Sequence, residues 1–90
     1  MPAAKSRRTV VRVQTGVRME KRLLQLLKAL AGTLDLSFGD LLEGIALHAL
    51  EGKASFSAQT LAKVKDLRRV YGLTLSAKDS HLLVERARRR

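Results

Sequence analysis

The sequence predicts a small, mostly helical domain with one β-strand near its N-terminus. Apolar and polar residues alternate along residues 9–19, TVVRVQTGVRM, as in a strand with one buried face. From residue 20 onward the apolar residues instead follow the period of an α-helix. Ninety residues form one domain with a modest core, and this size favours oligomerisation.

The predicted strand has two different faces. One face carries Thr9, Val11, Val13, Thr15, Val17 and Met19, and the other carries Arg12, Gln14, Gly16 and Arg18. No second stretch of the chain has a comparable pattern, and a single strand leaves its backbone donors and acceptors unpaired. We therefore expect the strand to pair antiparallel with the same strand of a second copy.

Two helices are expected after the strand. The first spans about residues 20–31, with Glu20 in its first turn and Gly32 as its stop signal. Its apolar stripe consists of Leu23, Leu26, Leu27, Leu30 and Ala31. The second begins after Ser37, the predicted N-cap, three residues before Asp40, and ends at Gly52. Its apolar face consists of Leu41, Leu42, Ile45, Ala46 and Ala49.

Residues 53–90 are predicted to form a helical extension. One helix is expected at about residues 57–71, closed by Gly72, and another at about residues 77–88, opened by Ser76 and Asp79. Residues 73–75 form a short link between them. The basic residues of the helix at 57–71 lie on more than one side, which favours a solvated face. Extra phosphate contacts, packing on the dimer and binding of another protein stay open as alternatives.

The charge of the chain is strongly basic. The net charge is +10 and the isoelectric point is about 11.2. Residues 1–22 and 55–90 each carry a net charge of +6, whereas residues 23–54 carry −2. This distribution favours a polyanionic partner such as nucleic acid, although basic tails also occur without a specific role. Residues 1–8 are predicted to be a mobile basic arm.

The sequence disfavours several other classes of protein. The chain has no cysteine, and His48 and His81 lack the spacing of metal ligands, so we expect no metal and no cofactor. Ser37 has no base at a suitable spacing, and no phosphate-binding glycine loop is present, so an enzyme is not expected. No segment resembles a membrane span or a secretory signal, and only 3% of the residues are aromatic. We expect a cytoplasmic protein without a membrane partner.

The order of strand, helix, turn and capped helix resembles the ribbon-helix-helix DNA-binding proteins of the MetJ/Arc class. The matching stretch is VRMEKRLLQLLKALAGTLDLSFGDLLEGIALHAL, residues 17–50, together with the strand before it. The resemblance implies an intertwined homodimer over residues 9–52 whose paired ribbon enters the major groove. Its implied dimer core consists of Val11, Val13, Val17, Met19, Leu23, Leu27, Leu30, Leu42 and Ile45.

The resemblance also assigns candidate DNA contacts. By position, Gln14, Gly16 and Arg18 would read bases, with Arg12 just beyond them. The N–H groups of Ser37, Phe38 and Gly39, at a helix start, would bind phosphate. The basic arm would add Lys5, Arg7 and Arg8. Two positions depart from the family, since Gly16 has no side chain and Asp35 stands where the family commonly has glycine.

These observations predict a transcriptional regulator, most simply a repressor, that binds double-stranded DNA as a homodimer. An alternative is the antitoxin of a toxin–antitoxin pair, with residues 53–90 binding the toxin. A further alternative is a protein-interaction module whose basic charge is incidental.

Overall fold

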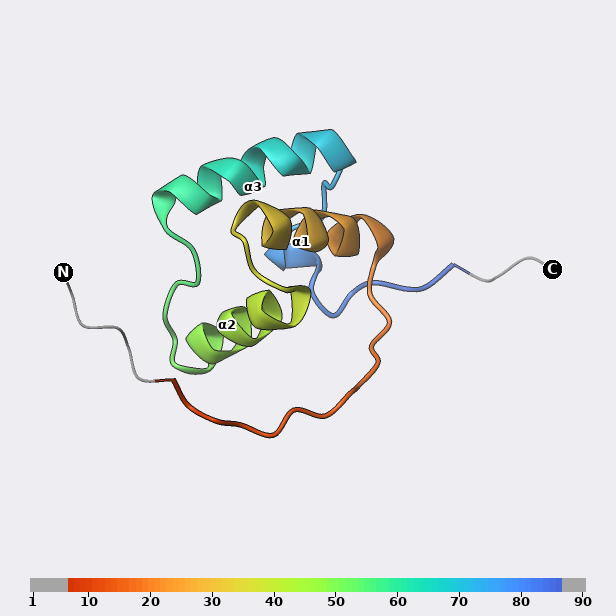
Figure 1. The fold of residues 1–90 in the computed structure, drawn as a ribbon. Coiled ribbons are helices and arrows are strands. Elements are labelled where there is room, and N and C mark those ends of the chain that lie inside the picture. Colours follow the sequence, from red (N-terminus) through yellow and green to blue (C-terminus); the bar gives the residue numbers. More distant parts are fainter. Residues whose placement is uncertain (1–6, 87–90) are drawn as a thin grey trace.

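A computed structural model describes residues 7–86, and its body consists of three helices. These are α1 (Lys21–Thr33), α2 (Phe38–Leu50) and α3 (Ala58–Tyr71), followed by a single 3₁₀ turn, η1 (Ala77–Asp79). Helix α1 lies between α3 and α2 and contacts both (Figure 1). Residues 7–20, before α1, and residues 82–86, after η1, run along the outside of this body as extended chain.

Side-chain caps set the start of each helix. The Glu20 carboxylate accepts from Leu23 N at 2.8 Å, and the Ser37 hydroxyl accepts from Asp40 N at 3.1 Å. The Ser57 hydroxyl accepts from Thr60 N, also at 3.1 Å. Each cap satisfies one of the backbone donors that a helix leaves free in its first turn. The predicted cap at Ser37 is confirmed. Ser57, which was predicted to start its helix, is the cap of α3, and Glu20 is the cap of α1 rather than a first-turn residue.

The C-terminal ends of the helices agree with the predicted ends in only one of two cases, α3 but not α1. Helix α1 continues through Gly32 to Thr33, so the predicted stop at Gly32 is wrong. The chain instead reverses at Asp35, whose φ of 59° is left-handed, a conformation that aspartate tolerates better than most residues. Helix α3 ends as predicted at Gly72, which caps it with φ of 66°.

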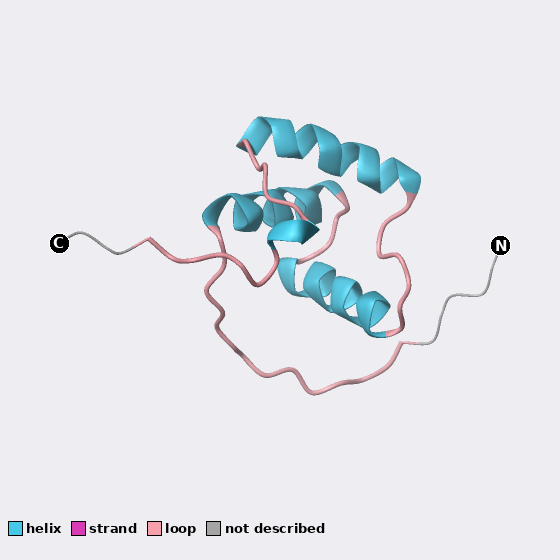
Figure 2. Ribbon diagram, turned by 180° about the vertical axis from the view of Figure 1, so that it is seen from behind, coloured by secondary structure: helices cyan, strands magenta, loops and turns pink. Residues whose placement is uncertain are grey.

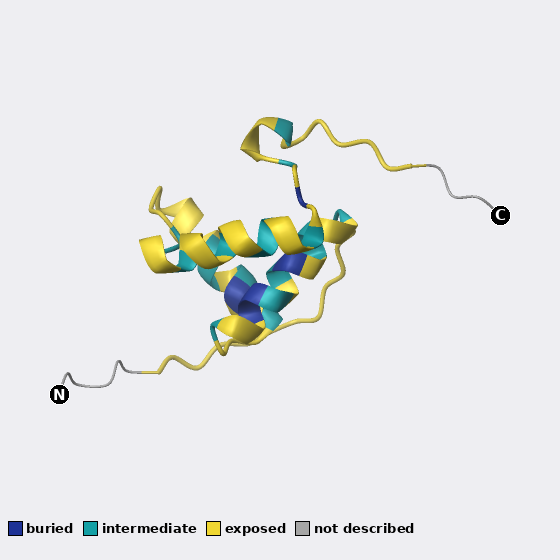
Figure 3. Cartoon of the chain, turned by 90° about the horizontal axis from the view of Figure 1, so that it is seen from above, coloured by how far each residue is buried: buried dark blue, intermediate teal, exposed yellow. Residues whose placement is uncertain are grey.

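The buried core of the chain is small. It consists of Leu26, Leu30, Ala31, Leu41 and Leu73. Figure 3 shows the buried positions in dark blue, within the helical body and in the link after α3. Leu73 was expected only to lie in a link, but it is 6% exposed and is one of the buried residues of the core.

The predicted strand is absent, which corrects the fold class. Among residues 7–86 there is no strand at all, and residues 7–20 form an extended segment without regular structure (Figure 2). Alternation places apolar side chains on one side of such a segment, but a strand also needs a hydrogen-bonded neighbour, and none lies beside it. The ribbon and the intertwined fold inferred from it are therefore wrong.

The single chain leaves most residues of the predicted dimer core at least partly exposed. Leu30 alone of that set is fully buried, at 0% exposure, and it contacts its own chain. Val11, Val13 and Val17 are 92%, 81% and 72% exposed. The remaining five are partly buried: Met19, Leu23, Leu27, Leu42 and Ile45.

The last predicted helix, at residues 77–88, is also wrong within the described residues. Ser76 N donates to the Asp79 carboxylate at 2.8 Å, so the capping residues interact, but only the η1 turn follows. His81 has φ of 68°, which stops the helix, and Leu82 and Val84 beyond it are exposed. A short helix gains most of its stability from packing an apolar face, and nothing packs against this one.

Candidate nucleic-acid interface

The extended segment, residues 7–19, carries most of the predicted DNA-contacting side chains. It leaves the N-terminus of α1 and runs around the outside of the molecule past α2 (Figure 1). Arg7, Arg8, Arg12, Gln14 and Arg18 are all exposed on it. Lys5, the remaining predicted contact of the basic arm, lies outside the described residues.

Arg12 is held by two carboxylates of α2. Its Nε and Nη2 atoms donate to the two oxygens of Glu43 at 2.9 and 2.8 Å, and Nη2 also donates to Asp40 at 3.2 Å. This two-point contact is the geometry in which arginine binds carboxylate or phosphate groups most strongly. It raises the pKa of Arg12, through the hydrogen bond to Glu43 first, and lowers the pKa of Glu43 in return.

Arg18 makes a similar contact with the C-terminal part of the chain. Its Nε and Nη2 atoms donate to the two oxygens of Glu85, which lies in the extended residues after η1. The hydrogen bond to Arg18 lowers the pKa of Glu85, and the positive charge of Arg18 adds to this effect. The same contact raises the pKa of Arg18. The pairing brings together residues that are 67 positions apart in the sequence.

The middle of the extended segment is open to solvent. Gln14 and Gly16 are both exposed, and a Cβ atom added at Gly16 would meet nothing within 4 Å. Side chains two residues apart lie on the same side of a regular extended backbone. Residues 12, 14, 16 and 18 therefore share one side wherever the backbone is regular. Space is therefore available at Gly16 for a ligand to approach the backbone.

The predicted phosphate site at the start of α2 has a mixed charge. Ser37 and Gly39 are exposed and Phe38 is partly buried, and the Ser37 hydroxyl is used as the helix cap. The Lys28 ammonium lies 5.9 Å from the centre of the Phe38 ring, so one cation is close to this helix start. Asp40 and Glu43 follow within two turns, and their negative charges oppose an anion there.

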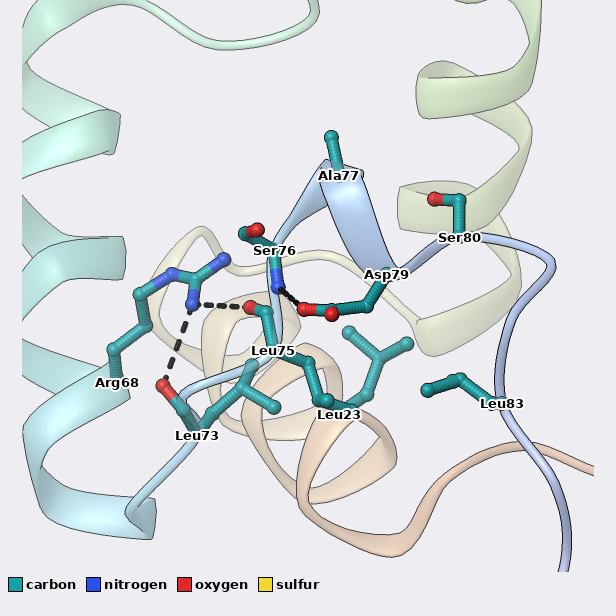
Figure 4. A pocket seen from close by; sticks show the side chains of 9 residues that line it. All are labelled: Leu23, Arg68, Leu73, Leu75, Ser76, Ala77, Asp79, Ser80 and Leu83. Atoms are coloured by element: carbon teal, nitrogen blue, oxygen red, sulfur yellow. Dashed lines mark hydrogen bonds between the residues drawn. The ribbon is translucent and has the colours of Figure 1, made fainter.

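Two arginines have structural roles that the sequence did not reveal. Arg22 Nη1 donates to the backbone oxygen of Gly72 at 3.1 Å and joins the start of α1 to the end of α3. Arg68 Nη1 donates to the backbone oxygens of Leu73 and Leu75, at 3.3 and 2.7 Å (Figure 4). Their charges are therefore used to fix the chain after α3, and no sequence motif marks them.

Arg68 also lines one of two small cavities. This cavity, of about 250 Å³, lies beside the link after α3 and is bordered by leucines at 23, 73, 75 and 83 (Figure 4). The second, of about 180 Å³, lies between α2 and the start of α3 and includes Phe56 and His48. His48 Nδ1 is 2.6 Å from the Gly44 oxygen of its own helix. Neither cavity gathers a set of charged groups.

Three further basic side chains lie on α3. Lys63 and Lys65 are exposed, and Arg69 pairs with Asp66 one turn earlier on the same helix at 2.6 Å. Within residues 7–86, no group of three or more His, Asp or Glu side chains is placed to hold a metal ion. None of the helices in this range has the length and apolarity needed to cross a membrane.

Comparisons with known proteins give no family for this chain. No protein-family model, no curated protein and no solved structure matches it.

Proposed function

We propose that this chain binds double-stranded DNA as a homodimer and regulates transcription. The observation that carries this proposal is the extended segment, in which four arginines and a glutamine are exposed along residues 7–18. Arginine and glutamine are side chains that bind base edges as well as phosphates. A net charge of +10 on 90 residues supports an anionic partner.

The proposed contacts divide into base contacts and phosphate contacts. Arg12, Gln14 and Arg18, with the open backbone at Gly16, are the proposed base contacts. Arg7, Arg8 and, outside the described residues, Lys5 are the proposed phosphate contacts of the arm. The backbone N–H groups at the start of α2 are the proposed second phosphate site, with Lys28 beside them. Phosphate contacts would supply most of the affinity.

The proposed homodimer rests on apolar surface. Helix α2 is the most apolar of the three, yet Leu41 is its only buried residue. Leu47 and Leu50 of the same helix are exposed, and so are the valines of the extended segment. Five buried residues make a small core for a chain of this length, and self-association is a common way to cover such surface.

A second candidate function is a protein-interaction module. The observation that favours it is that further apolar side chains are exposed, namely Leu61 and Val70 of α3 and Leu82 and Val84 after η1. Such a module could take a partner protein, including a toxin, in place of a second copy. In that case the basic charge would be incidental.

A titration with random-sequence duplex at two salt concentrations distinguishes these functions. DNA binding predicts an affinity that falls steeply as the salt concentration rises, because bound phosphates release counterions. The absence of salt-dependent binding would leave the interaction module. The mass in solution tests the dimer separately, since one chain has a mass of 10.0 kDa.

A further inference from the structure

The extended segment is joined to the rest of the molecule through its arginines. Arg12 binds Glu43 and Asp40 of α2, and Arg18 binds Glu85 of the C-terminal segment. Within residues 7–86, no other hydrogen bond connects residues 7–19 to the remaining chain. The two contacts span 31 and 67 residues of sequence, so they are tertiary contacts and not local ones.

Each contact uses the donors that a nucleic acid would need. Both arginines present Nε and Nη2 to the two oxygens of one carboxylate. The same pair of donors forms the two-point contact that arginine makes with a phosphate or with guanine. One guanidinium edge cannot make both contacts at once. Binding of DNA through this same edge of Arg12 or Arg18 therefore requires that the Glu43 or Glu85 carboxylate dissociate from it.

We propose that Glu43 and Glu85 restrain DNA binding by occupying Arg12 and Arg18 in the free protein. This inference rests on the proposed function, and it gives the C-terminal segment around Glu85 a role in that function. The two carboxylates stand in for phosphates and hold the extended segment against the body. DNA displaces them, and the segment is released from α2 and from residue 85.

The exposure of both pairs makes this displacement feasible. The side chains of Arg12 and Glu43 are 62% and 49% exposed, and those of Arg18 and Glu85 are 71% and 61% exposed. Solvent and salt screen pairs of this kind, so that each holds its arginine only weakly. Removal of one carboxylate is therefore expected to tighten DNA binding by about two- to fivefold.

The test compares three variants that change the net charge equally. Glu43→Gln and Glu85→Gln each remove one of the restraining carboxylates. Glu51→Gln is the matched control, because Glu51 pairs with Lys53 at 3.2 Å and touches neither arginine. The affinity of the full chain for a fluorescent 20-base-pair duplex is measured by anisotropy at low salt.

We expect E43Q and E85Q to bind about two- to fivefold more tightly than E51Q. In an Arg18→Ala background, E85Q should bind no more tightly than E51Q, because the restrained side chain is gone. If the wild type binds DNA and all three variants have equal affinities, the restraint is wrong and DNA binding stands. If no chain binds DNA, the proposed function fails and the inference fails with it.

Cleavage by trypsin measures the restraint without DNA. Trypsin cuts after arginine and needs a mobile chain, so the ion pairs should slow the cuts after Arg12 and Arg18. The E43Q variant should speed the cut after Arg12, and E85Q the cut after Arg18, with fragments identified by mass. Rates equal to those of E51Q at both positions would overturn the restraint whatever the DNA assay gives.

Discussion

Arg68 donates from one nitrogen to the backbone oxygens of both Leu73 and Leu75, at 3.3 and 2.7 Å. The link after α3 is thereby turned back toward α1, which brings Leu73 into the core and directs the C-terminal segment toward Arg18. Nothing in the sequence distinguishes Arg68 from the exposed basic residues around it, and yet its two hydrogen bonds fix the path of the chain after α3.

Arg68→Ala should lower the free energy of unfolding by about 1–2 kcal/mol, because two partly buried carbonyl groups lose their donor. Arg69→Ala is the matched control, since Arg69 pairs with exposed Asp66 and should cost less than about 1 kcal/mol. Urea unfolding followed by circular dichroism measures both. Equal losses would show that the contacts of Arg68 add nothing to stability.

Two glycine substitutions should have opposite effects. Gly32→Ala should raise the free energy of unfolding by about 0.5–1 kcal/mol, because Gly32 lies inside α1 and an added Cβ atom meets nothing within 4 Å. Gly72→Ala should lower it by about 1–2 kcal/mol, because φ at Gly72 is 66°. Thermal unfolding of the two variants gives the signs. Destabilisation by Gly32→Ala would mean that α1 ends before Gly32.

The ion pair of Arg12 and Glu43 should make the stability of the protein depend on pH. The pKa of Glu43 is lowered in the folded chain, so its contribution to stability is complete above the ordinary pKa of glutamate. That contribution should disappear as the pH falls through the lowered folded pKa. Carboxyl chemical shifts of Glu43 followed against pH measure this, and Arg12→Ala should return the pKa toward its ordinary value. An unchanged titration in Arg12→Ala would rule out the pairing.

Arg18→Ala should reduce the preference for a selected DNA site over random duplex by about 1–3 kcal/mol, which is the contribution of one two-point base contact. Lys5→Ala should instead weaken binding to every duplex alike, as expected of a phosphate contact. The selected site comes from enrichment of a random library on the wild-type chain. Equal weakening on all sequences by both variants would mean that Arg18 reads no base.

Local signals in the sequence predicted the local features of the fold. Ser37 and Ser57 begin helices and Gly72 ends one, because a cap depends on the few residues beside it. The alternation over residues 9–19 predicted a strand with two different faces. A strand also requires a second, hydrogen-bonded strand beside it, and the alternation gives no information about that. The contact of Ser76 with Asp79 forms as expected, and yet no helix follows without a surface to pack on.

The candidate site was predictable only in part. Arg12, Gln14 and Arg18 were expected to be exposed, and they are. Their acidic partners were not foreseen, because Glu43 and Glu85 lie far away in sequence and no local spacing indicates them. Asp40 was predicted only as a residue near the cap of α2, whereas both Asp40 and Glu43 bind Arg12.

The most direct test of DNA binding by the arm is its salt dependence. A double variant, Arg7→Ala with Arg8→Ala, should reduce the slope of log K against log salt by about 1.8, because each lost phosphate contact contributes about 0.9. Lys63→Ala with Lys65→Ala on α3 removes the same charge and should leave the slope nearly unchanged. Equal slopes for the wild type and both double variants would contradict the assignment of phosphate binding to the arm.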